Sequence, residues 1–375
     1  MPQKLTQCDD DGEDSGMTEA VLLVGGKGTR LRPLTLNTPK PMVPAAGVPF
    51  IAHQLARARA AGVRHVVLAT SYLAEVFEPY FGDGSAHGLR LTYVTEKEPL
   101  GTGGAIRSAA DALTTGPAGP VLVFNGDILT GLDIRGLLHR HERARADVTL
   151  HLTRVADPRA FGLVPTDADG RVLAFTEKPG RPEEIVTDQI NAGAYVFRRD
   201  VIDTIPTGRQ VSVERETFPG LLASGALLHG VVDASYWLDL GRPASFVQAS
   251  ADLVRGVVRS PAVPGEPGEH LLLPGAHAAP GARLSGGTVV GAGAYVAAGA
   301  EVDGSVVLDG ARIEAGARIR ASMIGQGARV GPRTALDGVV IGDHAEVGAD
   351  NELRDGARIW CGTVIPDAAI RFSAA

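Results

Sequence analysis

Short apolar runs alternate with helical patterns over the first two thirds of the chain. Val21–Val24 predicts a buried strand, and the glycine-rich loop Gly25–Arg30 follows it at once. Next, Phe50–Ala61 has the apolar spacing of a helix that ends at Gly62, and Val63–Thr70 predicts a second strand. A strand, glycine loop, helix and strand in this order predict the start of an α/β domain with a mostly parallel sheet.

The same alternation continues as far as residue 258. Further strands are predicted at Leu89–Thr95, Val121–Phe124, Asp147–Val155 and Gln189–Phe197, a hairpin at 161–179, and helices at Ile106–Leu113, Ser212–Leu222 and Pro243–Val258. His139 and His141 are two residues apart and therefore diverge on a helix, so we expect both on the surface rather than in a metal site.

From Leu284 onward the pattern becomes a regular spacing of aliphatic residues. They recur every six residues, with an occasional step of five, at positions 284, 290, 296, 302, 308, 313, 319, 324, 330, 336, 341, 347, 353, 359 and 365. Period six with glycines at the corners is typical of the hexapeptide β-helix, in which three short strands form each coil around a narrow aliphatic core. Because such a stack offers a flat flank, we expect it to mediate self-association into a homo-oligomer.

These patterns divide the chain into four segments. Residues 1–17 form an acidic tail that we expect to be disordered, 18–258 an α/β domain, 259–272 a proline-rich linker, and 273–370 the β-helix domain. The tail lacks the apolar segment of a signal peptide.

Composition excludes several classes of protein. The formal net charge of −7 argues against a nucleic-acid-binding protein, because any anion must then be bound by local cations. No apolar run approaches the roughly 20 residues that span a bilayer, so no membrane association is expected. The two cysteines, Cys8 and Cys361, do not suggest a disulfide framework, and a reducing cytoplasm fits best.

The loop after the first strand has the composition of a phosphate-binding segment. Its glycines allow successive backbone N–H groups to converge on an anion, while Lys27 and Arg30 add positive charge. Lys40 follows between Pro39 and Pro41, which stiffen the chain around it. The spacing matches neither the Walker P-loop nor the dinucleotide fingerprint, so the combination of glycines and cations carries the inference.

Other polar residues stand where ligands bind in α/β proteins. A second glycine-rich turn, Gly101–Gly104, either presents amides to a ligand or simply begins a helix. Asp127 directly follows a predicted strand, Asp239 lies on another, and Lys178 stands beside Glu177 before a proline. Two carboxylates together with phosphates suggest Mg²⁺, and hence phosphoryl or nucleotidyl transfer.

Six motifs carry a resemblance to a known family. LVGGKGTRLRPLT with PKPM, PLGTGG, NGD, FTEKP, INAGAYVF and WLDLG occur in this order, and hexapeptide repeats follow. The chain therefore resembles the sugar-nucleotide pyrophosphorylases, and within them it is most similar to the two-domain mannose-1-phosphate guanylyltransferases. The resemblance implies a Rossmann-like nucleotidyltransferase domain with a left-handed β-helix. It also implies a Mg²⁺-dependent reaction in which GTP and α-D-mannose 1-phosphate give GDP-mannose and pyrophosphate.

The same resemblance implies a role for each matching residue. Gly25 and Gly26 would contact the nucleotide; Lys27, Gly28, Thr29 and Arg30 its triphosphate; Lys40 a phosphate near the reacting centre; Gly101, Thr102 and Gly103 the base; Asp127 and Asp239 the Mg²⁺; Lys178 the sugar phosphate; and Gly162, Glu177 and Asn191 the hexose. Arg30 would also stabilise the departing pyrophosphate. Lys27 departs from what many family members carry at this position, which leaves the effect of its charge open.

Three alternatives remain open on the sequence. The same chemistry could use UTP, dTTP or ATP with glucose 1-phosphate. A regulatory subunit that senses sugar nucleotides without catalysis would keep the fold, although Arg30, Lys40, Asp127, Lys178 and Asp239 are all intact. Acyl transfer on the β-helix would use His344 as a base, but the sequence shows no coenzyme pocket, and a lone histidine on such a coil is more often solvated.

Overall fold

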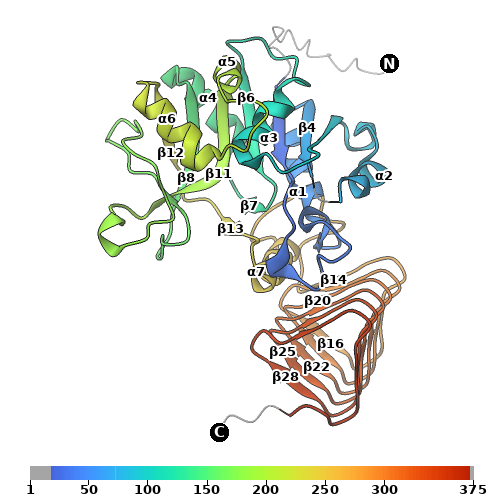
Figure 1. Ribbon diagram of the computed structural model, residues 1–375. Helices are drawn as coiled ribbons and strands as arrows, with labels where there is room; N and C mark the ends of the chain where they lie inside the picture. Colours follow the sequence, from blue (N-terminus) through green and yellow to red (C-terminus); the bar gives the residue numbers. More distant parts are fainter. Residues whose placement is uncertain (1–17, 72, 372–375) are drawn as a thin grey trace, which may run out of the picture.

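The computed structural model describes residues 18–71 and 73–371, which form two parts in contact (Figure 1). An α/β part comes first in the chain and a triangular β-helix follows it. The predicted tail, residues 1–17, lies outside the described residues. Within the described part of the chain, no helix is long and apolar enough to cross a bilayer.

One nine-stranded sheet organises the α/β part. Its parallel centre has the order β5-β4-β1-β6, with β5 at one edge of the sheet. On the other side β11 pairs antiparallel with β6, β8 and β9 pair antiparallel with β11, and β12 and β10 are the outermost strands next to β8 and β9. The strands are β1 (Glu19–Leu23), β4 (His65–Thr70), β5 (Arg90–Thr95), β6 (Pro120–Asn125), β8 (Val148–Arg154), β9 (Gly162–Leu163), β10 (Thr176–Glu177), β11 (Gln189–Arg198) and β12 (Leu228–Val232). Because the chain leaves β1 for β4 on one side and later reaches β6 on the other, the carboxyl end of β1 is a topological switch point.

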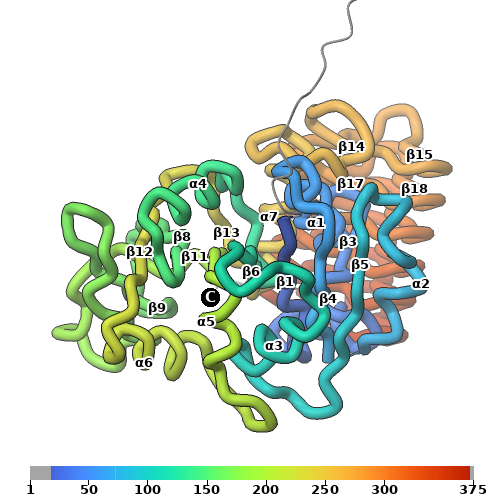
Figure 2. Tube along the Cα trace, turned by 90° about the horizontal axis from the view of Figure 1, so that it is seen from above, coloured from blue at the N-terminus to red at the C-terminus, as the bar shows by residue number. Residues whose placement is uncertain are grey.

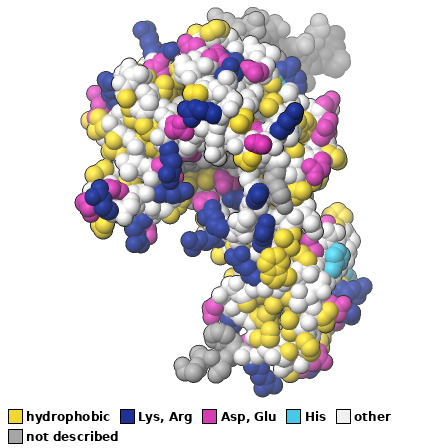
Figure 3. Space-filling view, in the orientation of Figure 1, with side chains coloured by type: hydrophobic (Ala, Val, Ile, Leu, Met, Phe, Trp, Pro, Cys, Tyr) yellow, Lys and Arg dark blue, Asp and Glu magenta, His cyan; other side chains and the backbone are white. Residues whose placement is uncertain are grey.

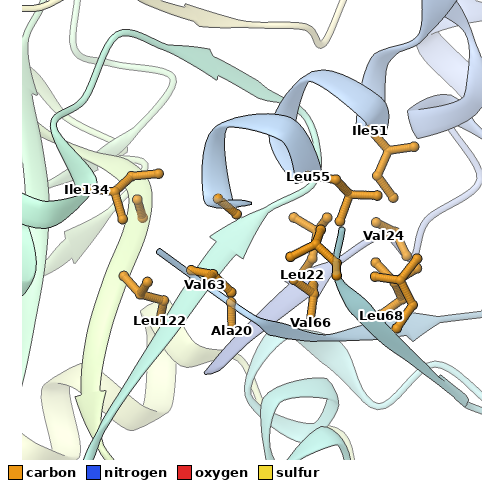
Figure 4. Packing of buried hydrophobic residues seen from close by; sticks show 14 of the residues in the cluster. Ala20, Leu22, Val24, Ile51, Leu55, Val63, Val66, Leu68, Leu122 and Ile134 are labelled. Atoms are coloured by element: carbon orange, nitrogen blue, oxygen red, sulfur yellow. The ribbon is translucent and has the colours of Figure 1, made fainter. Parts of the chain in front are cut away.

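Helices cover both faces of this sheet. They are α1 (Phe50–Ala60), α2 (Phe77–Phe81) and α4 (Ile134–Ala144) on one face, and α3 (Gly101–Ala110), α5 (Arg199–Asp203) and α6 (Phe218–Ala223) on the other. Figure 2 shows the two groups from above. Side chains of β1 alternate between the faces, so that Leu22 packs under Leu55 of α1 (Figure 4) while Val21 faces Ile106 of α3. Both faces are thus dry cores, as the continuous apolar runs of the parallel strands predict.

Two small antiparallel ribbons and one helix complete this part. The ribbons pair β2 (Pro44–Ala45) with β3 (Val48–Pro49), and β7 (Ile128–Thr130) with β13 (Trp237–Asp239). Helix α7 (Pro243–Val254) follows β13 and lies between the sheet and the β-helix (Figure 1).

The β-helix consists of three parallel sheets. The first contains β14 (His270–Leu272), β17 (Thr288–Val290), β20 (Val306–Val307), β23 (Met323–Ile324), β26 (Val340–Ile341) and β29 (Arg358–Ile359). The second contains β15 (His277–Ala278), β18 (Tyr295–Val296), β21 (Arg312–Ile313), β24 (Arg329–Val330), β27 (Glu346–Val347) and β30 (Val364–Ile365). The third contains β16 (Arg283–Ser285), β19 (Glu301–Asp303), β22 (Arg318–Arg320), β25 (Ala335–Asp337) and β28 (Glu352–Arg354). This arrangement confirms the predicted fold and is consistent with the left-handed form.

The interior of the β-helix follows the predicted repeat with one correction. Val290 pairs in register with Val307 and not with Leu308. The first five-residue step therefore runs from position 302 to 307, one repeat earlier than the predicted step from 308 to 313. Val307 is fully buried in the coil, whereas Leu308 is half-buried and packs against the α/β part. The period itself is confirmed, because Val302, Ile319, Leu336 and Leu353 stack in register inside the third sheet.

One flank of the β-helix is covered by the α/β part. Val289, Val306, Met323 and Val340 point outward from the first sheet and form one apolar cluster with α7 and with the segment after the glycine loop. The α/β residues of this cluster include Leu31, Leu34, Phe50, Leu240, Phe246 and Leu253. Beyond this cluster, Arg358 of the last coil donates to the carbonyl oxygen of Arg32 at 3.0 Å. The β-helix is therefore built onto the segment that leaves the glycine loop.

Three local differences from the sequence prediction remain. Helix α3 begins at Gly101, five residues before the predicted Ile106, because the glycine-rich turn is itself the first turn of the helix. His141 is buried rather than on the surface: it continues the apolar stripe of α4 and bonds Thr149 Oγ1 at 2.9 Å, while His139 is exposed as predicted. The first strand of the β-helix, β14, lies at the end of the segment predicted as a linker.

Candidate active site

The glycine loop leaves β1 at the topological switch point. Gly126 N donates to Leu23 O at 2.8 Å, and Val24 N donates to Ala69 O at 3.0 Å, so the ends of β1, β4 and β6 are tied together here. Gly28 has φ +56°, and a Cβ on it would lie 3.1 Å from Lys40 Cβ. The left-handed backbone and the close approach both require a glycine. As a result the loop lies directly against the segment that carries Lys40.

Lys40 and Asp127 meet at the floor of this loop. Lys40 begins a short 3₁₀ turn after the extended Pro39, and its side chain is only 13% exposed. Its Nζ lies 2.7 Å from Oδ2 of Asp127, which stands in the turn between β6 and β7. The proline-braced lysine therefore points at one carboxylate, and its contact with a phosphate stays a prediction.

Antiparallel pairing of β13 with β7 brings the second carboxylate to the first. Asp239 is opposite Ile128 in this ribbon, and Leu240 N donates to Asp127 O at 2.9 Å. Burial raises the pKa of Asp239, and the negative charge of Asp127 raises it further, while Lys40 and Arg30 act in the opposite direction. The four charged groups thus share one electrostatic site.

Gly241 closes the other side of this site. A Cβ on it would lie 3.0 Å from Asp239 Oδ2 and 3.1 Å from Arg30 Nη2, so any side chain here would separate the carboxylate from the guanidinium. A cavity of about 250 Å³ opens beside these groups, lined by Gly25, Gly26, Gly28, Thr29, Arg30, Leu31, Lys40, Asp127 and Gly241; Asp239 is not among its lining residues. Lys27, in contrast, is exposed and does not line the cavity. The face in Figure 3 has a shaded recess in the α/β part, with Lys and Arg side chains around it.

The donor set at this cavity fits a divalent cation of the Mg²⁺ type. In the described residues, no three His, Cys, Asp or Glu side chains come together as an all-protein metal site. Mg²⁺ does not need one, because it is usually held by one or two carboxylates together with substrate phosphates and water. Burial is the main cause of the raised pKa of Asp239, and repulsion from Asp127 adds to it, so a cation between the two carboxylates would relieve that repulsion.

A second group of predicted residues lies on β9, β10 and the start of β11. Gly162 pairs with Glu177 across the β9–β10 ribbon, and Lys178 Nζ lies 3.3 Å from Glu177 Oε1. Asn191 donates through Nδ2 to the hydroxyl of the buried Tyr195 at 2.8 Å.

Aromatic contacts join this second group to the β7–β13 ribbon. Trp237, two residues before Asp239, donates from Nε1 to Ala192 O at 3.0 Å. The Trp237 ring also meets the Phe161 ring edge-on, with centroids 5.4 Å apart. The ribbon that carries Asp239 is therefore in direct contact with the segments that carry Gly162 and Asn191.

The third group, at the start of α3, is engaged within the protein. The amides of Gly103 and Gly104 both donate to Val211 O, at 2.9 and 3.4 Å, so they are not presented to a ligand. The Thr102 hydroxyl donates to Glu214 Oε2 at 2.8 Å and accepts from Val213 N at 2.9 Å. Gly101 has a φ of +74° at the first turn of the helix. These bonds dock α3 on the π-helical turn Val213–Thr217, a type of turn that often occurs at functional sites.

Sequence reasoning missed two residues that shape the site. Val211 has no motif, and only the folded chain shows that its carbonyl oxygen caps α3. Gln54 was passed over in the first helix, although it stands four residues after Phe50 and four before Ala58, on the buried side of α1. A polar residue on an apolar helix face was the available signal.

Two family models match the chain. The nucleotidyl transferase model matches residues 19–256, and the model described as the GMPPB C-terminal domain matches residues 267–374. Together they cover both parts of the fold.

Several characterised proteins are similar in sequence. The mannose-1-phosphate guanylyltransferase of Mycobacterium tuberculosis is 58% identical over 356 residues, which are 95% of this chain and 98% of that protein. The mannose-1-phosphate guanylyltransferase catalytic subunit beta of Drosophila pseudoobscura is 38% identical over 61% of each chain. Mannose-1-phosphate guanylyltransferase 1 of Arabidopsis thaliana is also 38% identical, over 61% of this chain and 63% of that protein.

Solved structures resemble the α/β part. HddC from Yersinia pseudotuberculosis has a TM-score of 0.54 and 28% identity, over 62% of this chain and 98% of that chain. A glucose-1-phosphate thymidylyltransferase homologue from Bacillus anthracis, at 22% identity and a TM-score of 0.56 over 62% of this chain and 94% of that chain, supports the fold alone.

Proposed function

Because the chain belongs to the nucleotidyl transferase family, we propose that it transfers a guanylyl group from GTP to α-D-mannose 1-phosphate. The products are GDP-mannose and pyrophosphate. The observation that carries this choice of substrates is the similarity to the mycobacterial mannose-1-phosphate guanylyltransferase, which extends over both parts of the chain. The charged cavity at the switch point supports the type of reaction, because it collects cations and carboxylates around a glycine-rich loop.

In the proposed reaction, an oxygen of the sugar phosphate attacks the α-phosphorus of GTP. A new P–O bond forms as the bond from the α-phosphorus to the bridging oxygen breaks, and that oxygen leaves with pyrophosphate. The attacking oxygen is already ionised at neutral pH, so no protein base or nucleophile is needed. Catalysis then rests on positioning the two phosphates and on neutralising their charge.

The residues around the cavity divide this work. The loop residues Gly25, Gly26, Gly28 and Thr29 present backbone to the nucleotide and its triphosphate, as the resemblance implies. Arg30 lies beside Gly241 and stabilises the charge that develops on the departing pyrophosphate. Lys40 is held by Asp127 at the floor of the cavity, where its ammonium contacts the phosphate that reacts.

Asp127 and Asp239 are the residues that would hold Mg²⁺. Bound there, the ion would neutralise phosphate charge and orient the triphosphate. The nucleotidyl transferase family typically uses a divalent metal ion, and the choice of Mg²⁺ is part of this proposal. Fixed pairing of β7 with β13 keeps the two carboxylates close together, and among the residues that the structure describes no third acidic, His or Cys side chain joins them.

The two remaining groups of residues are assigned to the substrates. Glu177, Asn191 and Gly162 would contact the hexose and Lys178 its phosphate, as the resemblance implies. In support, Ala192 and Phe161, the neighbours of Asn191 and Gly162, contact Trp237 of the β7–β13 ribbon. Gly101, Thr102 and Gly103 would line the base pocket. Since the Thr102 hydroxyl and the Gly103 amide are engaged within the protein, their contribution is to shape this pocket rather than to donate hydrogen bonds.

Organisation beyond one chain is also part of the proposal. We retain the division into an α/β domain at 18–258 and a β-helix domain, predicted at 273–370 and beginning with β14 at His270. We also retain a homo-oligomer assembled through the β-helix and a cytoplasmic location. The α/β part covers the first sheet of the β-helix, so the second and third sheets are the flanks left for another subunit.

A matrix of substrates tests the proposed function. The purified chain is incubated with GTP, UTP, dTTP or ATP, each with mannose 1-phosphate or glucose 1-phosphate, and pyrophosphate release is measured. The highest kcat/KM is expected for GTP with mannose 1-phosphate. A higher value for UTP, dTTP or ATP with glucose 1-phosphate would replace the proposed substrates. Binding of GDP-mannose without turnover of any pair would identify a regulatory subunit instead.

A further inference from the structure

A half-buried glutamine of α1, Gln54, bonds to the backbone of the turn that carries Asp127. Gln54 Nε2 donates to Asn125 O at 2.8 Å and to Ile128 O at 3.2 Å. These two carbonyls stand on either side of Gly126 and Asp127, at the end of β6 and the beginning of β7. One side-chain amide group therefore bridges both ends of the turn.

The chemistry of this contact requires an amide. Both partners of Nε2 are carbonyl oxygens, which only accept hydrogen bonds, so the NH₂ group must face them and the orientation of the amide is fixed. Glutamate would have the same shape but would turn an oxygen toward two oxygens. Methionine would fill a similar volume and make neither bond.

Packing leaves a small void behind the turn. A cavity of about 30 Å³ lies behind it, lined by Gln54, Asn125, Ile128 and Gly193 among others. Oε1 of Gln54 and Oδ1 of Asn125 are buried without a hydrogen-bond partner among the described residues. Because the space behind the turn is not filled by side chains, the two bonds from Gln54 are direct constraints on its position.

The same helix is connected to the other side of the site. Phe50 N, at the start of α1, donates to Val43 O at 3.1 Å, and Val43 N donates to Lys40 O at 3.2 Å. The helix is thus tied to the segment of Lys40 at its first residue and to the turn of Asp127 one turn later. Helix α1 thus contacts the segments of both partners of the 2.7 Å ion pair, in addition to the bonds from Gly126 N to Leu23 O and from Leu240 N to Asp127 O that also hold the turn.

We propose that Gln54 is a positioning residue: it holds the Asn125–Ile128 turn so that the Asp127 carboxylate reaches a divalent ion together with Asp239. Gln54 acts through the backbone of the turn and not on the substrate. This inference rests on the proposed function, since it assigns the metal to Asp127 and Asp239. Residues that orient metal ligands typically change metal affinity or activity about 10- to 100-fold when they are replaced.

The test compares Gln54→Met with a variant of the same helix. Arg57, one turn further along α1, donates to Leu132 O at 2.9 Å and so also joins the helix to backbone, but beyond the Asp127 turn. Arg57→Met is therefore the matched control. Binding of Mn²⁺ to the protein with GTP and without sugar phosphate is followed by electron paramagnetic resonance, and the Mg²⁺ concentration at half-maximal turnover is measured separately.

Gln54→Met is expected to weaken Mn²⁺ binding about 10- to 100-fold and to raise the Mg²⁺ requirement in parallel, while Arg57→Met leaves both within about threefold of the parent protein. Circular dichroism and the melting temperature establish that each variant is folded. Gln54→Glu is the second variant and replaces Gln54→Met if that variant does not fold. It should also weaken Mn²⁺ binding and raise the Mg²⁺ requirement.

The outcomes separate this inference from the proposed function. If the parent chain neither binds Mn²⁺ nor turns over GTP, the proposed function fails. If the parent does both and folded Gln54 variants behave like it, or if Arg57→Met is equally impaired, the positioning role of Gln54 is overturned.

Discussion

Replacing Lys40 by methionine removes the cation at the floor of the cavity and keeps most of its volume. A unit charge about 4 Å from a phosphate oxygen at an effective dielectric constant of about 20 contributes about 4 kcal/mol. Some of this is offset, because Lys40 is also the partner of Asp127, whose carboxylate becomes free to approach a metal ion. We therefore expect kcat/KM to fall about 100- to 1000-fold, which corresponds to about 3 to 4 kcal/mol.

The assay is initial-rate pyrophosphate release with GTP and mannose 1-phosphate at saturating Mg²⁺. Lys97→Met is the control, because it removes an exposed lysine that does not line the cavity. Lys40→Arg keeps the charge but changes its geometry, and it should recover part of the lost rate.

A fall in kcat/KM of less than tenfold in Lys40→Met would refute the reasoning, since removal of an ammonium that contacts the reacting phosphate must slow the reaction more than that. An equal loss in Lys97→Met would refute it in another way, because the effect would then come from net charge. Thermal unfolding of each variant shows whether a fall in rate reflects chemistry or stability.

Three further predictions concern the metal site, the sheet and the contact between the two parts. Asp127→Ala should abolish turnover at every Mg²⁺ concentration without altering the circular dichroism spectrum; undiminished turnover would show that Asp127 is not a metal ligand. Burial favours a raised pKa for Glu19, but hydrogen bonds with His65, Thr115 and Thr114 hold that pKa at about 2, below the ordinary value of 4.5. The free energy of unfolding should therefore fall by about 3 kcal/mol as the pH falls from 4.5 toward 2. Glu19→Gln should remove this part of the pH dependence in urea unfolding, and an unchanged pH profile would contradict the assignment. Met323→Ala should lower the free energy of unfolding by about 2 to 5 kcal/mol, because this fully buried side chain fills the contact between the β-helix and the α/β part; urea unfolding measures it, and a change below 1 kcal/mol would indicate that the contact is loose.

Local patterns in the sequence predicted most of the fold. Strand and helix periods are set by neighbouring residues, so the elements around β1 and the six-residue period of the β-helix were predictable. The step at Val307 was misplaced because Val306, Val307 and Leu308 are all aliphatic, and only pairing with Val290 decides which of them points inward. Likewise His141 was misjudged because its partner, Thr149, lies on a different element.

The candidate site was predictable as a set of residues but not as an arrangement. Motifs named Lys40, Asp127 and Asp239, whereas the β7–β13 register that joins the two acids involves segments more than 100 residues apart. Val211 and Gln54 act through backbone bonds that leave no motif in the sequence. Adjacent aliphatic pairs in the repeat, such as Val289 with Val290, could have indicated that one flank of the coil is covered, since only one residue of each pair can face inward.

The covered flank means that the coil cannot be trimmed away as an independent appendage. The outward-facing valines and Met323 of the first sheet of the β-helix pack on Leu31 and Leu34, and Leu31 is the residue next to Arg30. A chain that stopped before residue 267 would expose these apolar residues to water, and one of them is the neighbour of Arg30, whose guanidinium is proposed to stabilise the leaving group. Any truncated form would therefore need new polar side chains at these positions before it could fold around a working pocket.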